Sequence, residues 1–306
     1  MLNWQPVIFM NKQIRGSASL LLATLIWGIA FIFQSVGMDH IGPFTFQTFR
    51  CGLAVIGMVA VIWLLDKKAG RSFKKGWQDK RLWKAGILCG IPLFLACDLQ
   101  QLGLVYTTAG KAGFLTAMYI VMVPVLGILL KRKITVMVPI SVGIAVAGLY
   151  LLSFSGTHGI NIGDILMLLC AVMFAVQILV VDHFAADVDA VRLNCIQAGV
   201  VSIVSAIITV FAEDVQVSSL MDCWLPLCYT GFLSMGAAYS LQIIGQKHVE
   251  PTAAALIMSL ESVFAALFGW LLLKEVMSLS EILGCVLMFS AVILSQIPVK
   301  TKKALP

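Results

Sequence analysis

The sequence predicts an all-α integral membrane protein, and three observations lead to this prediction. First, the chain of 306 residues is 60% hydrophobic and only 12% charged, whereas about a quarter of the residues in a soluble domain are charged. Second, its mean hydropathy is +0.98. Third, apolar blocks of about 20 residues alternate with short polar joints, and each block is long enough to cross about 30 Å of hydrocarbon as a helix. The blocks are continuously apolar, which favours helices over a closed barrel.

Ten blocks have the length and composition of a membrane span. Their expected limits are 17–37, 45–65, 83–105, 111–130, 136–154, 161–182, 193–211, 224–245, 251–273 and 279–297. They take up most of the chain, so the joints are short and leave no room for a soluble catalytic domain. The first block is too long for a signal-peptide core and no small-residue cleavage site follows it, so we expect it to be retained as a helix.

The positive charges gather in alternate joints. If the N-terminus is cytoplasmic, seventeen Lys and Arg residues fall in cytoplasmic segments and only two, Lys111 and Lys274, fall in external loops. By the positive-inside rule this split predicts a multi-pass protein of the plasma membrane with both termini in the cytoplasm. The net charge of +6 is therefore interpreted as topology, and no nucleic-acid partner is expected.

The eight cysteines predict no metal site and no disulfide framework. Most of them fall within apolar spans, no two form a CxxC pair, and none has a histidine at ligand spacing. We interpret them as small buried residues. Neither a metal nor a cofactor is expected.

The second half of the sequence resembles the first. Each half would contain five helices, and an odd number forces the second copy to be inverted relative to the first. The charges of the joints agree with an inverted copy. The joint Lys131-Arg132-Lys133, expected in the cytoplasm, is strongly positive, whereas the corresponding joint Lys274-Glu275, expected outside, has no net charge. Inverted repeats are the plan of many secondary transporters, whose substrate sites lie between the copies. The matched segments are 129–131 with 272–274, 142–153 with 283–295, and 50–52 with 197–199.

These observations predict five regions along the chain. The expected regions are a cytoplasmic segment 1–16, a first five-helix repeat 17–154, an external linker 155–160, a second five-helix repeat 161–297 and a cytoplasmic basic tail 298–306.

Several motifs resemble those of the EamA-type transporters, in the drug/metabolite transporter superfamily. The segment 103–116 (GLVYTTAGKAGFLT), with Tyr119 and 123–125 after it, resembles the family's junction between spans three and four. Trp27-Gly28, Arg50, and the segments 260–267 and 271–275 resemble the same family. The resemblance covers nearly the full length. It implies ten helices as two inverted halves around a central cavity, with no ATPase. Ser262 stands where the family commonly has proline, so we expect a straighter ninth span.

Glu261 is the leading candidate for the chemistry of this protein. It lies ten residues after Pro251, which is suited to the first position of a helix. At 1.5 Å per residue this places Glu261 about 15 Å deep, near the bilayer midplane. Buried charges are costly in a bilayer and usually functional. Two roles are open: a proton or substrate-amine site, or a structural carboxyl satisfied by a Ser or Gln of a neighbouring helix.

Three further charged residues are candidates. Asp98, in the outer half of span three with Gln101 one turn later, is expected either at the cavity or paired with Arg50. Arg50 itself either snorkels or forms a structural ion pair, or it contacts a substrate carboxylate. Lys111 opens a helix whose N-terminus favours anions, so it either meets lipid headgroups or helps to form an anion site.

Neutral residues within the spans complete the candidate set. Gln34, Gln177, Gln242 and Tyr239 are each expected to form helix–helix hydrogen bonds or to contact a ligand. Trp27 and Tyr119, with Phe31 and Phe264, are expected either to pack in the core or to provide aromatic walls for the cavity.

The favoured function is a secondary active transporter that exports a small metabolite, such as an amino acid, by alternating access, with proton coupling as one option. Drug efflux and facilitated uniport by the same fold remain alternatives. An intramembrane enzyme or a non-transporting scaffold or sensor are alternatives of another class. No GxSxG serine, HExxH pair or paired intramembrane aspartates are found, so no enzyme activity is expected. The expected partners are a small-molecule substrate and the lipid bilayer, and a homodimer is left open.

Overall fold

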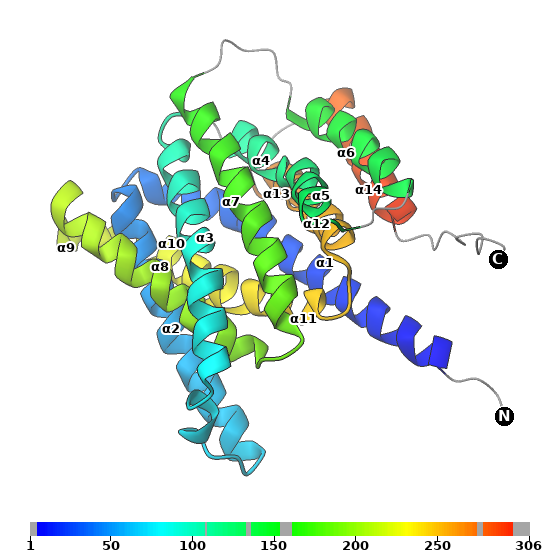
Figure 1. Ribbon diagram of the computed structural model, residues 1–306. Helices are drawn as coiled ribbons and strands as arrows, with labels where there is room; N and C mark the ends of the chain where they lie inside the picture. Colours follow the sequence, from blue (N-terminus) through cyan, green and yellow to red (C-terminus); the bar gives the residue numbers. More distant parts are fainter. Residues whose placement is uncertain (1–4, 108, 133–135, 154–160, 274–277, 296–306) are drawn as a thin grey trace.

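The computed structural model describes residues 5–107, 109–132, 136–153, 161–273 and 278–295, and these ranges contain helices and no strand (Figure 1). The expected linker 155–160 and basic tail 298–306 lie outside the described residues. The elements are α1 (Gln5–Met38), α2 (Pro43–Lys68), the 3-10 helix η1 (Lys75–Trp77), α3 (Lys80–Leu104), α4 (Ala109–Ala117), α5 (Tyr119–Leu129), α6 (Met137–Ser153), α7 (Ile162–Ala185), α8 (Ala190–Ala212), α9 (Val217–Asp222), α10 (Trp224–Cys228), the π-helix η2 (Tyr229–Ala238), α11 (Tyr239–Gln246), α12 (Pro251–Met258), α13 (Glu261–Leu273) and α14 (Leu279–Ser295).

The helices confirm a multi-pass membrane protein. Eight helical segments of the described chain are long and apolar enough to cross a bilayer. The remaining two expected spans, 136–154 and 279–297, coincide with the shorter apolar helices Met137–Leu151 and Leu279–Ser295. The count of ten crossings therefore stays a prediction.

Spans four and nine are both interrupted. The first breaks at Met118, between α4 and α5, and the second at Ser259 and Leu260, between α12 and α13. Met118 and Ser259 have ψ angles of −9° and −13°, flatter than in a regular α-helix. The expectation of a straighter ninth span is wrong, because this local 3-10-like turn interrupts the helix without a proline.

Helices of the first half pack directly on helices of the second half. α2 and α3 both lie against α8, and α6 lies against α14 (Figure 1). The α3–α8 crossing is close at Gly86, where an added Cβ would lie 2.5 Å from the Ile196 side chain. Gly90, one turn later, contacts Val200 in the same way. The spacing of these two glycines thus brings α3 and α8 together, which is typical of membrane helices.

Two ends of the bundle are distinguished by charge. We call the end with the joints 66–81, 130–132, 186–192 and 246–250 the basic end, and the end with the joints 39–42, 105–107 and 212–223 the opposite end. The basic end contains the ion pairs Arg132–Asp182 and Arg81–Asp187. At the opposite end, the Glu213 carboxylate accepts bonds from the backbone N–H groups of Phe44 and Thr45 at the start of α2.

Candidate functional site

A small cavity lies between the two halves of the chain. Its volume is about 40 Å³, which is room for about three water molecules. Helices from both halves contribute to its wall, whereas α8 contributes no lining residue in the described chain. The lining residues are Trp27, Phe31, Gln34, Arg50, Gln100, Thr116, Tyr119, Phe174, Gln177, Ile178, Ser234, Tyr239, Gln242, Met258 and Glu261.

Glu261 and Tyr119 meet at this cavity from the two interrupted spans. Tyr119 is the first residue of α5 and Glu261 is the first residue of α13. The Tyr119 hydroxyl donates to Oε1 of Glu261 at 3.2 Å, across 142 positions of sequence. Glu261 is only 6% exposed, and no cation is bonded to its carboxylate in the described part of the chain. Corresponding breaks in the two halves therefore place a tyrosine against a carboxyl group.

Arg50 lies on the wall of the same cavity. Its Nη1 donates to Oε1 of Gln34 at 2.7 Å, and its Nη2 lies 4.0 Å from Sγ of Cys97. Arg50 is 2% exposed, so it does not snorkel to the surface. The described residues form no ion pair with it. The guanidinium is thus held by neutral groups, and its charge remains available to an anion.

Four buried polar atoms on lining residues have no hydrogen-bond partner among the described residues. Three are donors, Nε1 of Trp27, Nε of Arg50 and Nε2 of Gln177, and one is an acceptor, Oε1 of Gln242. Gln242 and Gln177 bond to each other through their other amide atoms at 3.0 Å. Buried polar groups are rarely left unpaired without a reason. Free donors and acceptors at one cavity are what a polar ligand or ordered water would use.

Eight of the eleven predicted site residues line the cavity, and two of the described ones, Asp98 and Gln101, do not. Asp98 faces α8, where Ser205 donates to it at 2.9 and 3.0 Å. Gln101 donates instead to the backbone carbonyl of Gln34 at 3.3 Å. The side chain of Lys111 lies outside the described residues. The predicted pairing of Asp98 with Arg50 is not seen, because Cys97, one position earlier on α3, is the residue that faces Arg50.

Some lining residues were not predicted from the sequence. Gln100 donates to the Thr116 hydroxyl at 3.3 Å, and Phe174 contacts the Tyr119 ring edge to face at 6.4 Å between centroids. The predicted aromatic residue Phe264 packs against Phe289 and does not line the cavity. The only available signal for Gln100 and Thr116 was that both are polar residues within apolar spans.

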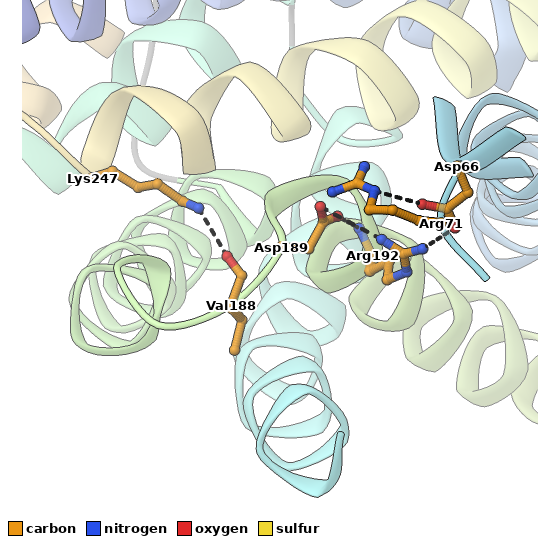
Figure 2. Close-up of polar contacts among 6 residues, drawn as sticks. All are labelled: Asp66, Arg71, Val188, Asp189, Arg192 and Lys247. Atoms are coloured by element: carbon orange, nitrogen blue, oxygen red, sulfur yellow. Dashed lines mark hydrogen bonds and ion pairs between the residues drawn. The ribbon is translucent and has the colours of Figure 1, made fainter. Parts of the chain in front are cut away.

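A second polar group lies at the basic end, outside the cavity (Figure 2). We call it the Asp66 cluster: Asp66 at the end of α2, Arg71 after it, and Asp189 and Arg192 at the start of α8. Asp66 pairs with Arg192 and, at 3.4 Å, with Arg71. Arg192 also pairs with Asp189 at 3.6 Å, and its guanidinium lies 5.7 Å from the centre of the Trp77 ring.

Lys247 adds a tie beside this cluster. Its Nζ donates to the backbone carbonyl of Val188 at 2.8 Å and joins the end of α11 to the joint before α8 (Figure 2). Burial lowers the pKa of the Lys247 ammonium, and the nearby Asp189 carboxylate opposes this shift. Neither Asp66 nor Arg192 was singled out as a site residue from the sequence.

Comparison with known proteins gives consistent matches. Residues 14–154 and 161–296 each match the EamA-like transporter family. An "Uncharacterized transporter" of Archaeoglobus fulgidus is 34% identical over 92% of this chain and 86% of its own length. The "Uncharacterized transporter YoaV" of Bacillus subtilis is 21% identical over 95% of this chain and 100% of its own length. A solved crystal structure is similar with a TM-score of 0.72 at 17% identity, covering 92% of this chain and 96% of the other.

Proposed function

We propose, from the premise that this chain belongs to the EamA-like transporter family, that it is a secondary active transporter of small zwitterionic metabolites of the amino-acid class. The proposed direction is export across the plasma membrane by alternating access. The proposed binding site is the cavity that contains both Arg50 and Glu261.

The proposed architecture is two inverted five-helix repeats, residues 17–154 and 161–297, that cross the bilayer ten times. The two separate family matches support the division. The breaks before Tyr119 and Glu261, at corresponding places in the two halves, support the inverted relationship. The concentration of Lys and Arg at the basic end supports a cytoplasmic location for that end and for both termini.

The single observation behind the substrate class is that a guanidinium group and an ionisable carboxyl group share one small cavity. Arg50, with free donors on Trp27 and Gln177, suits a carboxylate. Glu261, with the free acceptor on Gln242, suits an ammonium group. A neutral or singly charged ligand would leave one of these groups unmatched in a dry site, which is unfavourable.

The cavity must widen before such a ligand can bind. Its volume of about 40 Å³ holds only a few water molecules. The interrupted spans supply the segments that move, because an interrupted helix can tilt one half against the other, as in other transporters built from broken helices. In this proposal Glu261 binds a proton when no substrate amine is present, so proton entry and substrate exit share one carboxyl group.

A ligand-stabilisation screen of the purified protein tests this function. Amino acids should raise its unfolding temperature, and matched amides or amines that lack one charge should not. Glu261→Gln should abolish the effect of amino acids, whereas Glu281→Gln, a control on α14 away from the cavity, should preserve it. Stabilisation by lipophilic cations in place of amino acids would overturn the amino-acid assignment in favour of drug efflux.

Coupling is tested separately once a substrate is identified. If Glu261 binds the substrate's ammonium group directly, the Glu261→Gln variant in proteoliposomes should bind the substrate less tightly. If the variant instead binds normally but only equilibrates the substrate, Glu261 acts through its proton. Unchanged accumulation against a gradient, with unchanged pH dependence, would contradict both roles.

A further inference from the structure

Asp98 is a buried carboxyl group that the central cavity does not use. It lies on α3 six residues before the end of the helix and faces α8. It is 5% exposed. Its hydrogen-bond partner in the described part of the chain is the Ser205 hydroxyl, at 2.9 Å from one carboxyl oxygen and 3.0 Å from the other.

This donor set is too small for a buried carboxylate. An ionised carboxylate has two oxygens with about four acceptor sites, and Ser205 offers a single hydrogen. Burying an ionised carboxylate without a cation or several donors is very unfavourable, and such a group takes up a proton instead. The geometry therefore favours a neutral carboxylic acid, which needs fewer hydrogen-bond donors than a carboxylate.

A row of hydroxyl groups, with two gaps, extends from Asp98 toward the opposite end of the bundle. The Glu213 carboxylate accepts from the Thr45 hydroxyl at 2.6 Å. The hydroxyls of Thr48 and Thr209 lie 3.2 Å apart, and Thr209 is one turn beyond Ser205 on α8. The Thr48 and Thr209 hydroxyls also donate to the backbone carbonyls of Phe44 and Ser205, at 2.8 and 2.9 Å, so a hydroxyl must rotate to pass a proton along the row. Each of the two remaining gaps is one helical turn, which a single bridging water can span.

The row ends at an open cavity. Thr45, together with Asp39, His40 and Asp214, lines a surface cavity of about 430 Å³ at the opposite end. Glu213 is half-buried and bonds to Thr45, which lines this cavity. The row lies apart from the central cavity, because Thr45, Thr48 and the residues of α8 are not among those that line that cavity.

We propose that Asp98 is a second proton-binding site of this transporter, loaded from the opposite end through Glu213 and the hydroxyls of Thr48, Thr209 and Ser205. Each hydroxyl oxygen accepts a proton and gives the proton that it already carried to the next group. One proton therefore arrives at Asp98 for each proton that Glu213 takes from water. The proposal rests on the proposed function only for the external location of the opposite end and for the use of the bound proton.

The surroundings of Asp98 link its charge to the substrate site. The charged groups that interact with it from the packed helices are Arg50 on α2 and Glu213 after α8, and the thiols of Cys51 and Cys97 lie nearby. In the described part of the chain, α4 and α7 contribute no charged group to this set. An ionised Asp98 attracts Arg50, whereas a protonated Asp98 leaves the guanidinium to a substrate carboxylate. The charge state of Asp98 therefore acts on the anion-binding side of the cavity.

Infrared difference spectroscopy tests the proposal without a known substrate. The full-length protein in liposomes is compared at acidic and alkaline pH through the C=O stretch of protonated carboxyl groups. The wild type should show a buried carboxyl band that Asp98→Asn removes. Ser205→Ala should shift the frequency of this band, because the hydroxyl bond is lost. Asp222→Asn, at an exposed aspartate, should leave the band unchanged. A band that persists in Asp98→Asn would overturn the proposal.

The route is tested by kinetics. After a pH jump outside liposomes in which the opposite end faces outward, Thr209→Val should slow the appearance of the Asp98 band several-fold. The matched variant Thr230→Val should not, because Thr230 lies outside the row while its hydroxyl, like that of Thr209, donates to the carbonyl four residues earlier in its own span. Equal rates in all three proteins would overturn the hydroxyl route. Glu261→Gln should leave the Asp98 band in place, because this band does not depend on the substrate site. A wrong substrate site would therefore leave the band unaffected, whereas failure of this proposal would appear as a band that Asp98→Asn does not remove. If Asp98→Asn does not fold, Ser205→Ala decides by its band shift.

Discussion

Asp66 and Asp98 are two buried aspartates of the first half that both bond to α8, yet their partners differ completely. Asp66, at the basic end, is paired with the guanidinium groups of Arg192 and Arg71. Asp98, toward the opposite end, meets one serine hydroxyl. Because both side chains are buried, burial alone would predict the same behaviour for the two carboxyl groups. The difference teaches that the partners, and not the burial, decide whether a carboxyl group holds helices together or exchanges protons.

α8 is bonded to α2 at both of its ends. Its first turn is fixed to α2 by the Asp66 cluster, and the residue after its last turn, Glu213, is fixed to the start of α2. Between them Ser202 donates to the backbone carbonyl of Thr48 at 2.9 Å. α2 and α8 therefore form a pair held at both ends, and moving segments must be sought elsewhere, at the interrupted spans beside Tyr119 and Glu261.

The largest effect is expected from Arg192→Met. It leaves Asp66 buried with only the largely exposed Arg71 as partner, and breaking a buried ion pair in this way costs about 3–5 kcal/mol. The free energy of unfolding in mixed micelles measures the loss. Arg71→Met is the matched control, because its side chain is 61% exposed and surface ion pairs contribute at most about 1 kcal/mol. Similar losses for both variants would contradict the assigned role of Asp66.

A smaller effect is expected from Gly76→Ala. A Cβ at Gly76 would lie 2.5 Å from Nη2 of Arg192 and 2.6 Å from its Cζ, so the guanidinium that pairs with Asp66 must shift. Such overpacking costs about 1–3 kcal/mol. Gly113→Ala is the control, because nothing lies within 4 Å of its added Cβ. If the unfolding free energies of the two variants agree, Gly76 does not position Arg192.

The smallest effect on stability is expected from Asp98→Asn. An amide replaces a neutral carboxylic acid of the same shape and keeps a bond to Ser205, so the unfolding free energy should change by no more than about 1 kcal/mol. The same micelle assay measures it, near neutral pH. A loss as large as that of Arg192→Met would show that Asp98 is ionised and paired, as the sequence had suggested, and would remove the contrast with Asp66.

The spans were predictable because their signal is simple. Runs of apolar residues and the spacing of Lys and Arg depend on composition. Eight of the ten expected ranges coincide with helices long enough to cross a bilayer, and the other two with shorter apolar helices of the described chain. The breaks at Met118 and at Ser259 were not predictable, because no proline or glycine marks them. They arise where the two halves of the molecule meet, and a single span contains no signal for that contact.

The site was predictable in its charges and less so in its details. Arg50 and Glu261 stood out because charged residues are rare within spans. Asp98 was misplaced because successive residues of a helix point about 100° apart, so Cys97 faces Arg50 and Asp98 faces α8. The pairing of Asp66 with Arg192 joins residues 126 positions apart, and only the packing of α2 on α8 brings them together.

The pairing of α6 with α14 has a consequence for the surrounding lipid. These two helices pack side by side although one belongs to the first half of the chain and the other to the second. Both carry exposed apolar side chains, among them Ile140 on α6 and Val286 on α14. Lipid along this flank therefore touches both halves at once, and a movement of one half against the other changes the surface that the lipid meets.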